Sequence, residues 1–98
     1  MRIFFRPEAR AEMFDARAWY ESRSPGLGLE FARAVDAAVA SVIRNPHAYT
    51  QIEGECRRVI LRRFPYSMVY RPETNRLLIV AVFHHHRKPG DWVGRAGV

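Results

Sequence analysis

Apolar residues near the start of the chain predict a short strand followed by a helix. The strand covers Arg2–Phe5, because Pro7 ends it and suits the first turn of a helix. Across residues 8–22, apolar side chains recur at i, i+4, i+7 and i+11, which places them within about 60° of one another on a helix. These side chains are Ala9, Met13, Ala16 and Tyr20. Phe14 and Ala18 lie off this narrow stripe.

A second helix is predicted directly after the first. Ser24 is expected to cap it, with Pro25 at its first helical position. Its apolar positions are Leu27, Phe31, Ala34, Val35, Ala38, Val42 and Ile43. Asn45-Pro46 ends the helix, because the residue before a proline is disfavoured in the helical conformation. The loop between the helices is short, so we expect them to form an antiparallel hairpin.

The periodicity changes from helical to alternating after a turn-rich segment at residues 47–54. Strands are predicted at residues 57–61, 66–71 and 77–84, with a turn at 72–75 and the last strand central to the sheet. The order β-α-α-β-β-β predicts one α+β domain over residues 1–98. The helical hairpin should cover one face of a small, mainly antiparallel sheet and leave the other face to the arginines.

Composition limits the class of protein. A chain of 98 residues, 48% of them hydrophobic, has a single core. No run approaches the ~18 apolar residues of a membrane span, and the N-terminus lacks the apolar region of a signal peptide. Cys56 is the only cysteine, which excludes an internal disulfide and fits a reducing compartment. We therefore expect a cytoplasmic protein without membrane contact.

Positive charge is concentrated in the second half of the chain. The first fifty residues hold seven arginines against six acids, whereas residues 51–98 hold nine basic residues against four acids. Almost all of these bases are arginine, whose planar guanidinium binds carboxylates and phosphates through two parallel hydrogen bonds. We expect this half to meet an acidic partner, either nucleic acid or an acidic protein segment. One or two of the arginines could instead be a solvated strand edge.

One set of residues has the chemistry for RNA cleavage. Attack by a 2′-hydroxyl needs a base, an acid for the leaving oxygen, and cations on the phosphate. The chain offers a base from Glu53 or Glu55, cations from Arg58 or Arg63, and an acid from His84 or His86. The spacing of these residues is not specific to a nuclease.

The run His84-His85-His86 raises the question of a zinc site. On a strand His84 and His86 share one face while His85 points to the other, so the run supplies at most two ligands. No spacing places a third ligand beside them. We therefore predict neither a metal nor a cofactor.

A series of short motifs along the chain has the order and spacing of a known family. They are Trp19-Tyr20, Gly26-Leu27-Gly28 with Phe31, Asn45-Pro46 with Tyr49, Arg57-Arg58, Arg63-Phe64-Pro65-Tyr66 with Tyr70, and Ala81-Val82 followed by His84, Arg87, Pro89, Trp92 and Arg95. Together they resemble the RelE/ParE superfamily of bacterial type II toxins, and its ParE-like, plasmid-stabilization branch in particular. The resemblance covers nearly the whole chain.

The resemblance implies a toxin that a ParD-like antitoxin, encoded beside it, neutralises in a hetero-oligomeric complex. ParE-type members are known for poisoning DNA gyrase, and RelE-type members for cleaving mRNA on the ribosome. RelE-like nucleases supply lysines and arginines from the sheet and a C-terminal tyrosine. This chain has no lysine in its predicted strands and no tyrosine after Tyr70. We therefore expect a gyrase poison that acts by binding, with a RelE-like mRNA endonuclease as the alternative.

The predicted partner surface combines apolar and basic side chains. A disordered, acidic and amphipathic antitoxin tail would fold on such a surface. Trp92 follows the last strand, where it would contact a partner or cover the sheet. The predicted partner-binding residues are Phe14, Ala18, Arg57, Arg58, Arg62, Arg63, Arg87, Trp92 and Arg95.

Overall fold

The computed structural model describes residues 1–86 and 92–96. Its elements are β1 (Arg2–Phe5), α1 (Pro7–Arg23), α2 (Leu27–Arg44), β2 (Thr50–Glu53), β3 (Cys56–Ile60), β4 (Tyr66–Pro72), β5 (Arg76–His84) and α3 (Val93–Ala96). The predicted α+β class and the predicted helical hairpin are confirmed. The segment predicted to be rich in turns also holds β2, and a short helix follows the last strand.

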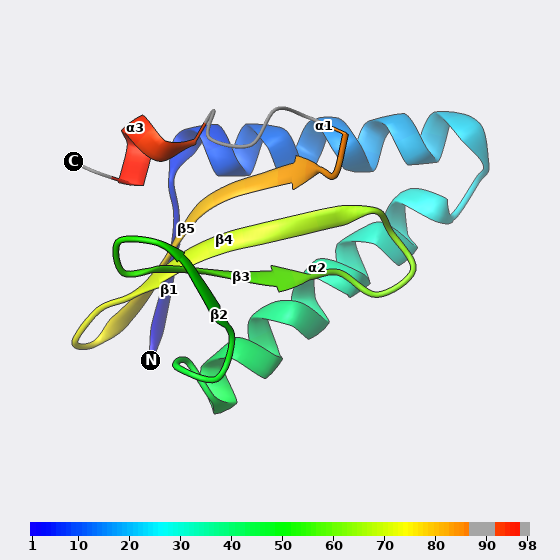
Figure 1. The fold of residues 1–98 in the computed structure, drawn as a ribbon. Coiled ribbons are helices and arrows are strands. Elements are labelled where there is room, and N and C mark those ends of the chain that lie inside the picture. Colours follow the sequence, from blue (N-terminus) through cyan, green and yellow to red (C-terminus); the bar gives the residue numbers. More distant parts are fainter. Residues whose placement is uncertain (87–91, 97–98) are drawn as a thin grey trace.

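The strands form one five-stranded sheet in the order β1-β5-β4-β3-β2. β1 pairs with β5 in parallel, and every other pair is antiparallel. The last strand is predicted to be central to the sheet: β5 does lie inside it, between β1 and β4, but the middle strand of the five is β4. Figure 1 shows α1 and α2 packed side by side along one face of this sheet. The helical hairpin connects β1 at one edge of the sheet to β2 at the other edge, and it forms the second layer of the fold.

The main core lies between the helical hairpin and the sheet. The predicted stripe of α1 faces it: Ala9 and Ala16 are buried, and Met13 and Tyr20 pack against the buried residues. The ring of Tyr20 stacks on Phe31 of α2, with ring centroids 5.4 Å apart. The side chains below 2% exposure on this face are Ala9, Phe31, Val35, Val42, Met68, Tyr70, Leu77, Ile79 and Val82. Their burial fixes which face of each strand looks toward the helices.

The start of α2 differs from the prediction. Ser24 ends α1 by donating its backbone N–H to Tyr20, and α2 begins at Leu27 after Gly26, whose φ is 90°. The cap comes from α1: the Glu21 carboxylate accepts the N–H of Gly26 at 3.1 Å and that of Gly28 at 3.0 Å. A carboxylate from a neighbouring helix therefore satisfies the free N–H groups of the first turn, which the predicted Ser24 cap would otherwise have served.

A second, smaller apolar cluster covers part of the opposite face. It contains Trp92, Cys56 and Val69, together with Val80 and Ala81 of β5. A β-bulge in β5 explains why two successive residues belong to this cluster. Val69 of β4 pairs with Ala81, and the next residue, Tyr70, pairs with Ile79, so Val80 is the extra residue of the bulge. The prediction that this face is left to the arginines is therefore wrong in part, because Trp92, only 6% exposed, covers one portion of it.

The last helix is fastened to the edge of β5. β1 pairs with β5 only as far as Ile79. The residues of β5 that follow Ile79 therefore have an edge that β1 does not cover. There the Glu12 carboxylate accepts the N–H of Val82 at 3.0 Å and two hydrogen bonds from Arg95, at 2.9 and 3.0 Å. Arg95 also donates to the carbonyl of Val80 at 3.3 Å. Two side chains thus satisfy main-chain groups that an exposed sheet edge would leave open.

Candidate partner-binding surface

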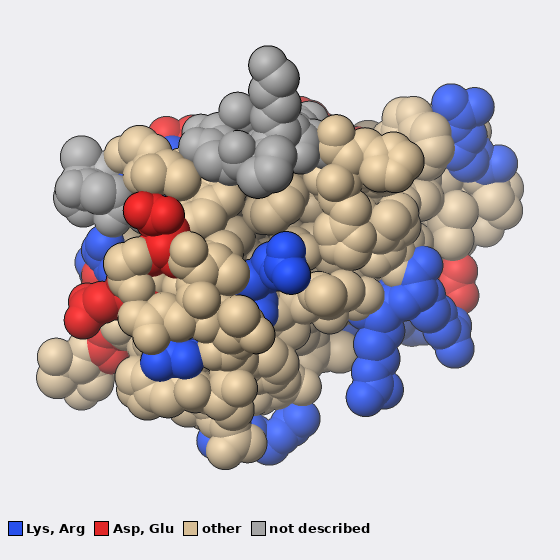
Figure 2. All heavy atoms as spheres, in the orientation of Figure 1, with Lys and Arg blue, Asp and Glu red and all other residues tan. Residues whose placement is uncertain are grey.

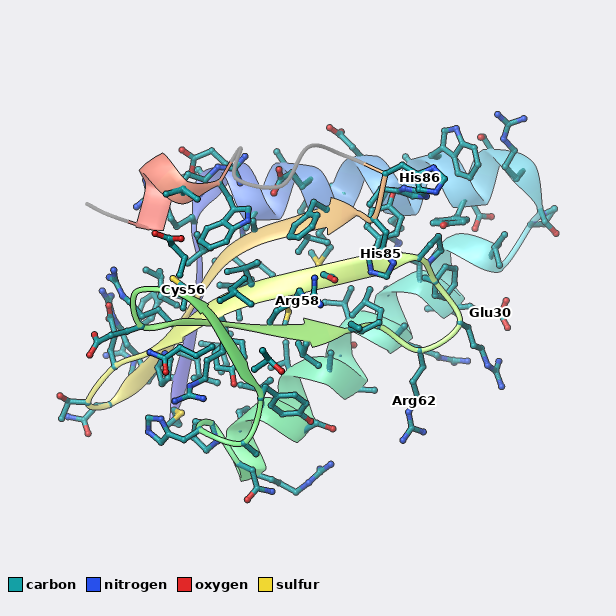
Figure 3. The ribbon with its side chains drawn as sticks, viewed as in Figure 1. Glu30, Cys56, Arg58, Arg62, His85 and His86 are labelled. Atoms are coloured by element: carbon teal, nitrogen blue, oxygen red, sulfur yellow. The ribbon has the colours of Figure 1, made fainter. Side chains whose placement is uncertain are left out.

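Three of the predicted arginines are exposed at the β3 side of the sheet. Arg58 points out from the open face, opposite Val69, and Arg62 and Arg63 form the hairpin between β3 and β4. In the described part of the chain, no ion pair engages any of the three. Figure 3 shows Arg58 over the middle of the strands and Arg62 extending away from the body of the protein. These guanidiniums are available to an acidic partner.

The hairpin that carries Arg62 and Arg63 is held by its own buried ring. Phe64, 8% exposed, packs edge-on against Tyr20 at 4.8 Å and Phe31 at 5.2 Å between centroids. Arg63 takes a left-handed backbone conformation, with φ of 69°. That conformation is uncommon for a residue other than glycine. The anchor ring and the tight turn leave both guanidiniums outside the core.

Arg57 has a structural role that the sequence did not reveal. Its side chain points to the helical side, where Nη1 donates to the carbonyls of His47 at 3.0 Å and Tyr49 at 2.7 Å. Beside it the hydroxyl of Tyr70 donates to the carbonyl of Pro46 at 2.6 Å. Burial raises the pKa of Tyr70 to about 12. These bonds fix the loop between α2 and β2 to the sheet.

The remaining predicted residues do not join the exposed arginines in one surface. Trp92 and Arg95 make the internal contacts described above, and Arg87 lies outside the described residues. Phe14 is 49% exposed and, like Ala18, lies on the side of α1 away from the core stripe. The helices cover one face of the sheet and Arg58 lies on the other. Among the described residues, Figure 2 shows basic side chains at several places on the open face and at its margin.

The candidate nuclease residues are not brought together. Glu55 precedes β3, and its neighbour Glu53 ends β2, at the end of the sheet where β4 finishes. His84 pairs with Tyr66 at the other end of β4. The two ends of β4 are six residues apart along the strand, which corresponds to roughly 20 Å. The ring of His84 lies against Tyr66, with centroids 5.1 Å apart, on the helical side rather than the side of Arg58. The ring of His86 lies against His84, with centroids 4.9 Å apart.

The middle histidine takes the opposite direction. His85 Nε2 lies 3.0 Å from the hydroxyl of Ser67, a residue with no exposed surface. A buried serine cannot reach a substrate, so this pair orders the strand ends. Within residues 1–86 and 92–96, no group of three or more His, Cys, Asp or Glu has the geometry to hold a metal ion.

The hollows lined by described residues include two between the helices and the sheet, and the sequence did not predict either of them. One, of about 520 Å³, lies between α1 and the end of β5 and includes Glu12, Asp15, Trp19 and Tyr66. The other, of about 480 Å³, lies between α2 and β3 and includes Ala34, Ala37, Ser41 and Ile60. The only sequence signal for the second was the recurrence of small residues along one side of α2.

Comparison with known proteins places this geometry in a family. A family model described as "ParE toxin of type II toxin-antitoxin system, parDE" matches residues 3–89. A solved structure described as "Chromosomal ParDE TA system from P. aeruginosa" has the same fold, with a TM-score of 0.73 and 19% sequence identity over 86% of this chain and 95% of that one. No curated protein matches the chain. Among the described helices, none is long and apolar enough to cross a membrane.

Proposed function

This chain belongs to the ParE toxins of parDE type II toxin–antitoxin systems, and we propose that it stops growth by poisoning DNA gyrase. A cognate ParD-like antitoxin binds it in the cytoplasm and holds it inactive in a hetero-oligomeric complex. The observation that carries the proposal is the family match over residues 3–89, which covers α1, α2 and, apart from Arg2, all five strands.

The arrangement of side chains supports action by binding over RNA cleavage. A nuclease needs its base, its acid and its phosphate cations within hydrogen-bonding reach of one phosphodiester. Here Glu55 and His84 lie near opposite ends of β4, and Arg58 lies on the face opposite the ring of His84. That separation favours the gyrase poison over the RelE-like endonuclease.

The exposed arginines provide the chemistry for contact with an acidic target. Arg58, Arg62 and Arg63 present guanidiniums outside the core, and guanidinium binds phosphate and carboxylate with two hydrogen bonds. A complex of gyrase with DNA offers phosphates, and an antitoxin segment offers carboxylates. Both contacts should weaken as salt concentration rises.

Expression in a bacterial host tests the proposal. The chain alone should arrest growth and induce the DNA-damage response, and co-expression of the protein encoded by the adjacent reading frame should restore growth. Replacing both His84 and His86 with Ala should leave the arrest in place, because neither imidazole has an acid role in a poison. Translation arrest with cut mRNA that disappears in the double variant would establish the endonuclease instead. Soluble expression without any growth defect would refute the toxin activity of this chain.

A further inference from the structure

The hollow between α2 and β3 has one wall made of unusually small side chains. Ala34, Ala37 and Ser41 are spaced three and four residues apart, so they lie on one side of α2. The facing wall is the end of β3, with Val59 and Ile60. Protein interiors are close-packed, and a hollow of about 480 Å³ lined this way has room for several side chains of another segment.

The strand that borders this hollow has an edge that β2 does not reach. The pairing of β2 with β3 ends at Thr50, opposite Arg58. Leu61 donates its N–H to Tyr66 of β4, so the alternation of an antiparallel strand turns the N–H and C=O of Ile60 to the outer side. An edge of this kind accepts an extended segment through main-chain hydrogen bonds. The side chain of Ile60 is 56% exposed there.

Each wall of the hollow also carries a guanidinium. Arg44 comes from α2, where its Nη2 donates to Ser41 at 3.2 Å, and Arg62 comes from the hairpin after β3. Both side chains are exposed, and Figure 3 shows Arg62 reaching outward from the hairpin. Carboxylates are the groups that complement a pair of guanidiniums on a protein surface.

The hollow between α1 and the end of β5 has a different character. Its lining includes the carboxylate of Asp15, which repels an acidic segment, and that of Glu12, which already accepts hydrogen bonds from Val82 and Arg95. The β5 edge beside it already receives hydrogen bonds from Glu12 and Arg95. Charge and edge availability therefore favour the α2–β3 hollow for an acidic, extended ligand.

We propose that the hollow between α2 and β3 binds an extended acidic segment of the antitoxin, which adds to the sheet as a strand beside Ile60. Alternate side chains of that segment insert among the alanines of α2, and its carboxylates meet Arg44 and Arg62. The inference rests on the proposed function, since the ligand belongs to the neutralising partner. The proposed antitoxin site does not include Phe14 and Ala18, which the sequence had suggested as partner-binding residues and which lie on the outer side of α1.

The test uses the purified full chain and the protein encoded by the adjacent reading frame. Ala37→Trp fills the hollow from an exposed position, and Arg62→Glu reverses the charge at its rim. Ala11→Trp and Arg33→Glu are matched controls, since both residues are exposed on helices and neither lines the hollow. Calorimetry should show binding weakened at least about tenfold by each hollow variant and within about twofold of wild type for each control.

Hydrogen exchange on the same complex tests the strand addition itself. The amide of Ile60 should become protected when the partner binds, whereas a helix lying in the hollow would leave that amide exchanging as before. Tight wild-type binding with no effect of Ala37→Trp or Arg62→Glu would overturn the proposal. So would protection of Ile60 in the free chain that depends on protein concentration, because a second copy would then occupy the hollow. Absence of any binding by the wild-type chain would refute the proposed neutralisation, and the site with it.

Discussion

At the scale of single residues, the junction between α1 and α2 depends on a carboxylate and a glycine. Glu21 accepts the N–H groups of Gly26 and Gly28, and a Cβ added at Gly28 would lie 2.8 Å from the carbonyl oxygen of Arg17. That contact is with backbone, which cannot move aside as the tip of a side chain can. The sequence suggested a cap from Ser24 because local rules see only neighbouring residues. The Glu21 cap depends on the packing of two helices.

The prediction for this junction concerns stability. Gly28→Ala should lower the free energy of unfolding by about 1–3 kcal/mol, because the added methyl group forces the helices apart. Gly94→Ala is the matched control, since an added Cβ there meets no atom within 4 Å. Urea denaturation of both variants checks the difference. Equal stability of Gly28→Ala and wild type would show that the helices can separate at no measurable cost.

Tyr70 gives a second residue-scale prediction, which concerns high pH. Burial raises the pKa of Tyr70 to about 12, while the unfolded chain ionises near the ordinary value of about 10. Its contribution to stability is therefore complete below about pH 10 and is lost as pH rises toward 12. Tyr70→Phe should cost about 1–2 kcal/mol at neutral pH, because the Pro46 carbonyl loses its donor.

The pH dependence itself provides the control for Tyr70. Unfolding of Tyr70→Phe, followed from pH 8 to about 11.5, should show a shallower loss of stability than wild type. Tyr49→Phe removes a hydroxyl from the neighbouring ring, 6.5 Å away between centroids, and is the control for loss of a tyrosine hydroxyl beside the same loop. Identical slopes for wild type and Tyr70→Phe would contradict the role given to Tyr70.

At the scale of elements, the sequence predicted those whose apolar pattern is strong. The apolar stripe of α1 predicted a helix that is buried on one side, and the continuous apolar run of β5 predicted a strand that is buried on both faces. The sequence did not predict β2, because Ile52 is the only residue of this strand that is even partly buried and the strand has no apolar pattern. Its pairing with β3, and the bond from Gln51 to the carbonyl of Gly54 at 2.6 Å, hold it instead. The bulge at Val80 also has no local signal.

The attachment of α3 to β5 yields the prediction at this scale. Arg95→Ala should destabilise the protein by about 1–3 kcal/mol, because Glu12 loses two charge-assisted hydrogen bonds in a half-buried place. Hydrogen exchange should also speed up at the amide of Val82. Arg76→Ala is the control, since the pair of Arg76 with Glu73 is more exposed and should contribute less than about 1 kcal/mol. A larger effect at Arg76 would reverse this ranking.

At the scale of the whole molecule, the distribution of charge differs from the simple division seen in the sequence. The second half of the chain is the basic half, yet Arg57, Arg71, Arg76 and Arg95 are committed to internal contacts. Among the described residues of this half, the arginines left for a partner are Arg58, Arg62 and Arg63, at one end and one face of the sheet. Sequence reasoning could count the charges, but only the strand register shows which of them face inward. The same register separates Phe14 from the arginines with which it was grouped.

The measurement that tests the central claim most directly uses purified protein, DNA gyrase and supercoiled plasmid. A ParE toxin that poisons gyrase should trap cleavage complexes, so linear DNA should accumulate with increasing protein after digestion of the enzyme. Adding the protein encoded by the adjacent reading frame should abolish that linear DNA. Gyrase that continues to supercoil the plasmid without any trapped cleavage, at protein concentrations far above those that arrest growth, would contradict the account.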